Sequence, residues 1–181
     1  MLRVAALLLL VTAVSACDEA DPADTRTDRE RIVETWSATT ANVRVDGLPF
    51  GIPVADLTAQ GDMHEFRFQD SGAFSFLFVP APGRRVTISY QGTEYASFPV
   101  QRVGLAGDYT VDEEADTITF STIIGSTLDD FRMGYRFSGT RMELIAEDPE
   151  TLARLFGLAD ADAVQLARVV TGGSVTYTPG S

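Results

Sequence analysis

Residues 62–79 have the sequence DMHEFRFQDSGAFSFLFV, and this stretch decides the fold. Apolar and aromatic side chains occupy every second position on both sides of Asp70-Ser71-Gly72, which is a tight-turn sequence. Period-two alternation indicates a strand with one buried and one solvated face. The stretch therefore predicts an antiparallel hairpin with its buried face formed by His64, Phe66, Phe68, Phe74, Phe76 and Phe78.

The same alternation recurs along most of the chain. Further strands are expected over 36–46, 85–91, 95–100, 107–111, 116–121, 131–138, 141–146 and 174–178. Short strands separated by turn sequences are typical of a sandwich or barrel built as a meander. We predict an all-β domain over residues 29–181 with minor helices, forming an antiparallel up-and-down barrel of 8–10 strands.

Three segments depart from the strand pattern. Thr27 and Glu30 form a possible capping box, which predicts a short helix over 28–35. Residues 48–60, with two Pro and a Gly, predict a long loop or short helix over one barrel end. Residues 149–170 predict two helices. The first starts at Pro149 and closes at Gly157, and the second is capped by Asp160 or Asp162 and ends before Gly172-Gly173.

The N-terminus predicts export and anchoring. Arg3, an apolar run and small residues describe a signal peptide over 1–16. Val14-Ser15-Ala16-Cys17 resembles the bacterial lipobox, which implies that Cys17 is acylated, with palmitate among the acyl groups, and becomes the first mature residue. An ordinary signal peptide that ends at a cysteine is the alternative. Residues 17–28 then form the acylated cysteine and an acidic tether.

The composition limits the classes of partner that the chain is expected to bind. The chain carries 14 basic residues, all Arg, against 26 acidic ones, and its formal net charge is −12. This charge argues against nucleic-acid binding and against docking on anionic lipid, so the acyl anchor is the expected membrane contact. One His and one Cys leave no zinc site or internal disulfide. We expect a monomer without cofactor or metal.

Localisation follows from the anchor and the acidic run after it. The cell envelope is the expected compartment. Asp18-Glu19 directly after the cysteine resembles a surface-export signal of some lipoproteins and an inner-membrane retention signal of others. The Lys-free composition favours the outer membrane, with surface exposure, over the inner membrane.

Several motifs resemble the lipocalin family, and more narrowly the lipocalin-like lipoproteins of bacterial envelopes. They are Glu34-Thr35-Trp36, the hairpin 66–74, and the pair 107–111 and 116–120 with its Gly-x-Tyr and Asp-x-Ile-x-Phe patterns. The match covers roughly residues 30–146. The resemblance implies a barrel, and a small hydrophobic ligand bound within it.

An eight-stranded barrel is just wide enough to be filled by side chains or to hold one small ligand. Both outcomes stay open. A ligand would be contacted by aromatic side chains on the buried face, and the candidates are Phe66, Phe68, Phe76, Tyr90, Tyr135 and Phe137. A filled barrel would instead favour a structural or interaction lipoprotein.

Catalytic and metal-binding alternatives have weaker support. His64 lies on the Phe66/Phe68 face without a nucleophile elbow, so a core or barrel-mouth histidine is favoured over a hydrolase. The acidic stretch 112–116 lacks EF-hand spacing and predicts a solvated hairpin tip rather than a Ca²⁺ site. A non-catalytic protein is expected.

Overall fold

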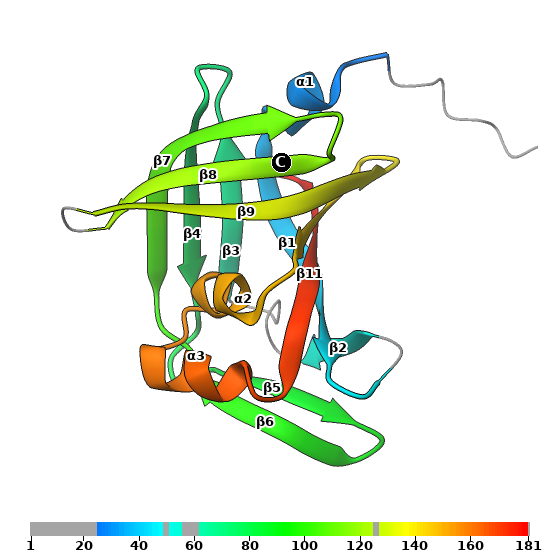
Figure 1. Cartoon of the computed structure of the whole chain (residues 1–181), viewed down its shortest axis with the longest axis vertical. Coiled ribbons are helices and arrows are strands. Elements are labelled where there is room, and N and C mark those ends of the chain that lie inside the picture. The colour runs from blue at the N-terminus through cyan, green and yellow to red at the C-terminus, as the bar shows by residue number, and fades with distance from the viewer. Residues whose placement is uncertain (1–24, 49–50, 56–61, 125–126, 181) are drawn as a thin grey trace, which may run out of the picture.

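The computed structural model describes residues 25–48, 51–55, 62–124 and 127–180. In these ranges the chain forms eleven strands and three short helices (Figure 1). In order they are α1 (Asp28–Ile32), β1 (Thr35–Val45), β2 (Gly51–Ala55), β3 (Met63–Phe68), β4 (Ala73–Val79), β5 (Arg85–Tyr90), β6 (Thr93–Pro99), β7 (Val103–Asp112), β8 (Thr117–Ile124), β9 (Thr127–Ser138), β10 (Arg141–Ala146), α2 (Pro149–Leu155), α3 (Asp160–Leu166) and β11 (Val170–Pro179).

Eight of these strands close into an antiparallel barrel. Around the barrel the order is β1-β3-β4-β7-β8-β9-β10-β11, and β11 pairs back with β1. Neighbours in the barrel follow one another along the chain, so the topology is up-and-down. The predicted fold class is confirmed.

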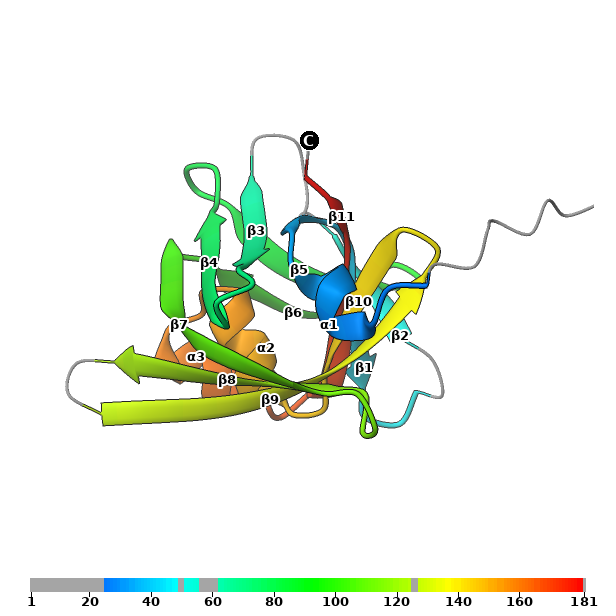
Figure 2. The ribbon, with the colours of Figure 1, turned by 90° about the horizontal axis from the view of Figure 1, so that it is seen from above.

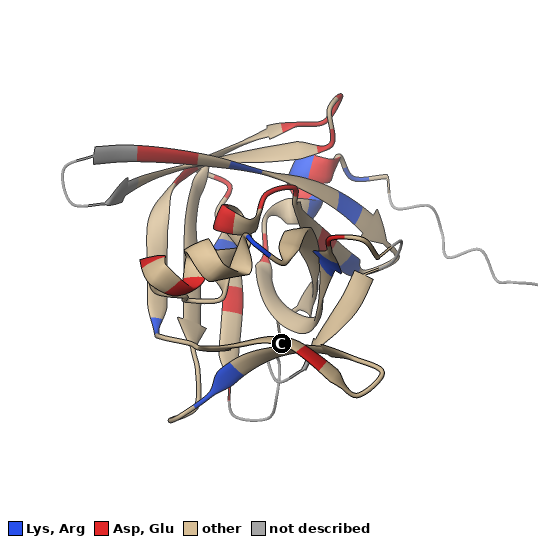
Figure 3. Ribbon diagram, turned by 60° about the horizontal axis from the view of Figure 1, so that its bottom comes forward, with Lys and Arg blue, Asp and Glu red and all other residues tan. Residues whose placement is uncertain are grey.

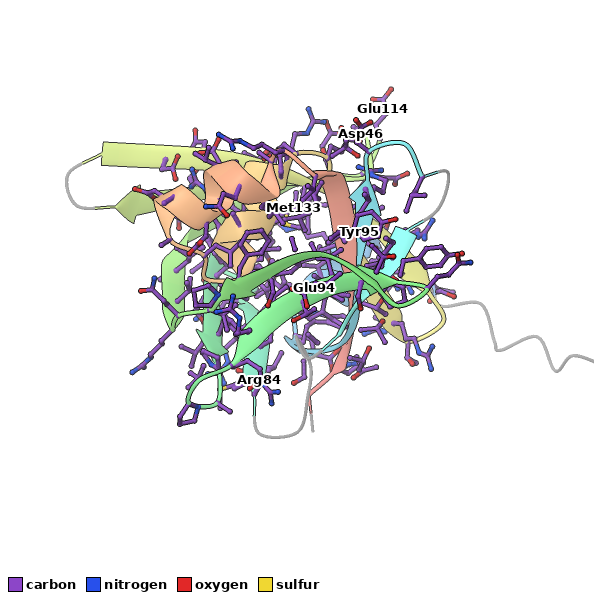
Figure 4. All side chains as sticks on the ribbon, turned by 90° about the horizontal axis from the view of Figure 1, so that it is seen from below. Asp46, Arg84, Glu94, Tyr95, Glu114 and Met133 are labelled. Atoms are coloured by element: carbon purple, nitrogen blue, oxygen red, sulfur yellow. The ribbon has the colours of Figure 1, made fainter. Side chains whose placement is uncertain are left out.

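The remaining strands form a small extension. β2 pairs with the second half of β1, β5 pairs with β2, and β6 pairs with β5. Figures 1 and 4 show β5 and β6 lying across the lower end of the barrel. Residues 48–60 were expected to cover a barrel end as loop or helix, and Gly51–Ala55 is instead a strand. Residues 56–61 lie outside the described ranges.

The Phe-rich hairpin forms as predicted. β3 and β4 pair with Phe66 opposite Phe76 and Phe68 opposite Phe74. The inward-facing residues are buried, and the residues between them are exposed or half-buried. Gly72 has φ +87°, which makes glycine the favoured residue at the turn. This hairpin supplies much of the aromatic core.

The barrel wall is complete over only part of its height. β7 pairs with β4 from Val103 but with β8 only from Gly107. β9 pairs with β10 only from Gly134 to Ser138. Beyond Thr122, the end of β8 and the start of β9 continue as a short two-stranded arm (Figure 1).

Two helical predictions are only partly right. The capping box of Thr27 and Glu30 is present, yet α1 ends at Ile32 because β1 begins at Thr35. The second C-terminal helix has Ala159 at its N-cap rather than an aspartate, and it ends at Leu166. Val170 already belongs to β11 and pairs with Val45, so the last strand is longer than expected. The described part of the chain contains no helix that is long and apolar enough to cross a membrane.

Candidate functional site: the plug helix and its grooves

Helix α2 lies inside the barrel. Asp148 caps it, because its Oδ1 accepts a hydrogen bond from the Thr151 amide at 2.7 Å. Leu152, Leu155 and the following Phe156 are fully buried. Seen from above, α2 sits within the ring of barrel strands (Figure 2). We call α2 the plug helix.

His64 joins the plug helix to the barrel wall. Its Nε2 lies 3.2 Å from the Leu155 carbonyl oxygen, and its Nδ1 lies 3.3 Å from the Tyr177 hydroxyl. A carbonyl only accepts, so Nε2–H is the donor and Nδ1 accepts from Tyr177. Burial lowers the pKa of His64 to about 4. Both ring nitrogens of this neutral imidazole therefore have structural partners.

Aromatic rings fill the space above the plug helix. The Phe66 ring centroid lies 4.6 Å from that of Phe76 and 5.6 Å from that of Phe120. Phe120 stacks on Phe131 at 4.7 Å. Tyr177 closes the cluster, 5.7 Å from Phe66. The upper interior is therefore occupied by the protein's own side chains.

Four of the six predicted ligand-binding residues belong to this packed interior: Phe66, Phe68, Phe76 and Tyr135, none more than 2% exposed. Tyr135 donates a hydrogen bond to Asp28 of α1 at 3.1 Å. Burial and the nearby Asp28 carboxylate raise the pKa of Tyr135. Helix α1 thus contacts a buried residue of the barrel.

The other two predicted residues, Tyr90 and Phe137, pack against the core but are less buried. Tyr90 is half-buried on β5 in the extension, and its hydroxyl accepts from Gln91 Nε2 at 3.1 Å. Phe137 is also only half-buried, with the Arg31 guanidinium 3.8 Å from its ring centroid. Period-two patterning identifies a face of a strand but not the strand's position around the barrel. The six residues consequently do not form one site.

Two open grooves flank the plug helix. One, of about 710 Å³, runs between the plug helix and β9. Its lining is mostly charged: Asp129, Asp130, Arg132, Glu147, Asp148, Glu150 and Arg154. Arg154 pairs with Asp129 and with Glu150, so it fastens the plug helix to β9. Acidic residues are spread over the helices in Figure 3.

The second groove, of about 780 Å³, lies between β7 and the two C-terminal helices. Its walls are largely apolar and include Val103, Leu105, Ala153, Leu158, Ala163 and Val164. Val164 is 59% exposed, more than the other exposed large apolar residues of the described ranges, Met63 and Tyr95. We call this hollow the β7 groove.

The acidic hairpin tip is held by hydrogen bonds from backbone amides. Asp112 accepts from the Ala115 amide at 3.1 Å, and Glu113 accepts from the Arg29 amide at 3.0 Å. Within the described ranges, no three carboxylate, His or Cys side chains are placed to hold a metal ion. Cys17 lies outside those ranges, so its predicted acylation stays a prediction.

Comparison with known proteins adds no identity, because no family model, curated protein or solved structure matches the chain. The site must therefore be interpreted from its own residues. Sequence reasoning missed Tyr177 as the partner of His64 and missed both grooves. Asp148 and Pro149 did mark where the plug helix begins, but no local signal shows that a helix enters a barrel.

Proposed function

We propose that this chain is a lipid-anchored, non-catalytic protein of the cell envelope that binds a partner on its outer surface. The barrel acts as a rigid scaffold for that surface. One observation carries the proposal: the plug helix and the aromatic cluster occupy the interior where a small ligand would bind. The open space of the two grooves lies beside the plug helix, between it and β9 in one case and between the C-terminal helices and β7 in the other.

Displacing the plug helix would be costly. It would expose Leu152, Leu155 and Phe156, each worth about 1.5–3 kcal/mol of burial. It would also leave His64 without its carbonyl partner, and a buried polar group without a partner costs about 1–3 kcal/mol. A ligand for the interior would have to compensate for both. The filled barrel thus favours the interaction function over storage of a small hydrophobic molecule.

The geometry of His64 also supports a non-catalytic role. Its ring is 5% exposed and is packed 5.0 Å from Phe76 and 5.3 Å from Phe78. A general base must reach the proton that it abstracts. The His64 imidazole is enclosed by phenyl rings and hydrogen-bonded at both ring nitrogens, so it cannot reach the proton of a substrate.

The first prediction concerns the interior. Native mass spectrometry of the protein purified from its host membrane should show the acylated chain without a non-covalent molecule. Phe156→Ala is the positive control, because removal of a buried ring leaves an apolar void, and such voids bind benzene. We expect added benzene to raise the melting temperature of this variant and to leave that of the wild type unchanged.

One result would overturn the proposal. That result is the retention of one hydrophobic molecule per chain both in the wild type and in the Val164→Arg variant. Val164 is exposed in the β7 groove, so its replacement disturbs the outside only. Retention in that variant would place the ligand inside the barrel.

A second prediction concerns the anchor. Cys17→Ser removes the only thiol of the chain, so we expect the protein to leave the membrane fraction or to accumulate unprocessed. Membrane fractionation and the mass of the mature chain measure this.

We further propose outer-membrane display, which predicts that protease added to intact cells cleaves the 18–28 tether. Unchanged fractionation and mass in the variant would refute the anchor, and full protection of intact cells would refute display.

A further inference from the structure

Strand β7 has an open edge beside the β7 groove. The Tyr109 amide donates to the Gly72 carbonyl oxygen on the β4 side at 2.7 Å. Backbone groups alternate along a strand, and the β4–β7 register runs without a bulge from 103 to 108. The N–H and C=O groups of Gly104 and Ala106 therefore face away from β4. The first β8 pair, Gly107–Thr122, engages the Ala106 carbonyl, so within the described ranges the Ala106 N–H and both backbone groups of Gly104 are left without a partner strand.

The unpaired edge of β7 is long enough for about four residues of an extended segment. At one end the Gln101 amide already donates to the Gly157 carbonyl oxygen at 2.9 Å, and at the other β8 begins. Four residues of β7 lie between these points, about 13 Å of strand at the usual rise of about 3.3 Å per residue. Gly104 and Ala106 are exposed and small, so they leave the approach to the edge clear.

Charge around the groove indicates what would fill it. Asp148, Glu150 and Asp160 are among the residues that line it. Arg154 is the one cation among its described lining residues, and it is already paired with Asp129 and Glu150. An apolar floor with a negative rim is complementary to a side chain with an apolar stem and a positive head. Arginine and lysine have this form.

We propose that the open β7 edge and the β7 groove bind an extended, basic segment of a partner protein as an added strand. Backbone hydrogen bonds would form to Gly104 and Ala106. Inward-facing side chains would lie over Leu105 and Val164, with basic heads at the carboxylate rim. This is the strand-addition mode of peptide recognition. The inference rests on the proposed function and specifies the partner that function requires.

The test uses three labelled seven-residue peptides and fluorescence anisotropy on the full acylated protein in detergent. The basic probe is acetyl-Thr-Arg-Thr-Val-Thr-Arg-Thr-amide. The second has Glu in place of Arg, and the third is the basic peptide with alternate amides N-methylated. We expect the basic probe to bind, and the other two to bind at least about tenfold more weakly, since one lost buried hydrogen bond or ion pair has that effect.

Two variants test the position. Ala106→Pro removes the N–H that faces the open side and keeps the hydrogen bonds to β4, which an edge strand tolerates. Val164→Arg puts a positive charge on the groove floor and does not depend on strand tolerance. Both should weaken binding of the basic probe at least about tenfold. Glu94→Gln, on exposed β6 and outside the groove lining, is the matched control and should bind as the wild type does (Figure 4).

Each outcome supports or overturns one part of the inference. Equal binding of the N-methylated peptide overturns strand addition, equal binding of the Glu peptide overturns the basic partner, and unchanged binding in Val164→Arg overturns the position. Binding of no peptide also overturns the inference. None of these results touches the proposed function, whose filled interior is tested by the mass-spectrometry experiment and whose anchor is tested by Cys17→Ser.

Discussion

Replacing Phe66 with alanine should lower the free energy of unfolding by about 3–5 kcal/mol. The Phe66 side chain is fully buried, and its ring lies within 6.4 Å of the rings of Phe68, Phe74, Phe76, Phe120 and Tyr177. Its removal therefore leaves a cavity with rigid walls, because strands on two sides hold the neighbours in register. Urea unfolding followed by fluorescence of the single Trp would measure the loss.

Two further variants make this result specific. Phe76→Ala should lose a similar amount, since Phe76 faces Phe66 across the β3–β4 pair and is 1% exposed. Tyr95→Ala, on β6 and 38% exposed, should change stability by less than about 1 kcal/mol. A loss below about 1 kcal/mol for Phe66→Ala would mean that the alternating face of β3 is not the core.

The β3–β4 hairpin shows what sequence can establish. Its alternation reports which face is buried, and Gly72 reports the turn, because both are local properties of the chain. The same rule misplaced Tyr90 and overstated the burial of Phe137. Each alternates correctly on its strand, but β5 lies outside the barrel and Phe137 is only half-buried beneath Arg31. Whether a residue on the alternating face is fully buried or only half-buried depends on contacts between strands that are far apart in sequence.

The C-terminal segment shows a different limit. From the sequence, Gly172-Gly173 predicts the end of a helix, because glycine commonly follows the last helical residue. In the structure Gly173 lies within β11, where an added Cβ would come 2.4 Å from the Asn42 carbonyl oxygen. The residue is glycine because two backbones approach closely, which depends on β1 and cannot be read from the residues around it.

The helix beginning at Pro149 is predicted by the sequence, but its place inside the barrel is not, for a physical reason. An amphipathic stripe such as Leu152, Leu155 and Phe156 indicates only that a helix packs against something apolar. Here the helix lies where the wall is incomplete, because β7 departs from β8 before Gly107 and β9 departs from β10 before Gly134. No residue of the helix encodes that departure. The candidate site therefore had to come from the structure.

Acidification should test the plug helix through the single histidine of the chain. In the folded protein burial lowers the pKa of His64 to about 4, from 6.5 when exposed. Between these values the unfolded chain binds a proton that the folded chain excludes. The free energy of unfolding should therefore fall as pH drops from 6.5 to 4, by about 3 kcal/mol from this group, with no further change above or below that window.

The His64→Gln variant isolates that contribution. Its amide can donate to the Leu155 carbonyl and accept from Tyr177 without titrating, and burial raises the pKa of Tyr177, which stays neutral throughout. Carboxylates titrate in both proteins, so the difference between the two stability curves belongs to the imidazole. We expect the wild type to lose about 3 kcal/mol more than the variant between pH 6.5 and 4.

Proton NMR would then locate the cause. The chain contains one His, so its ring resonance needs no assignment and should shift with a midpoint near 4. Parallel stability curves together with a midpoint near 6.5 would show that His64 is reached by water, and hence that the plug helix does not occupy the barrel. A midpoint near 4 would instead show that the plug helix occupies the barrel. The phenyl rings and the Leu155 carbonyl exclude water from the imidazole only while the helix is in place.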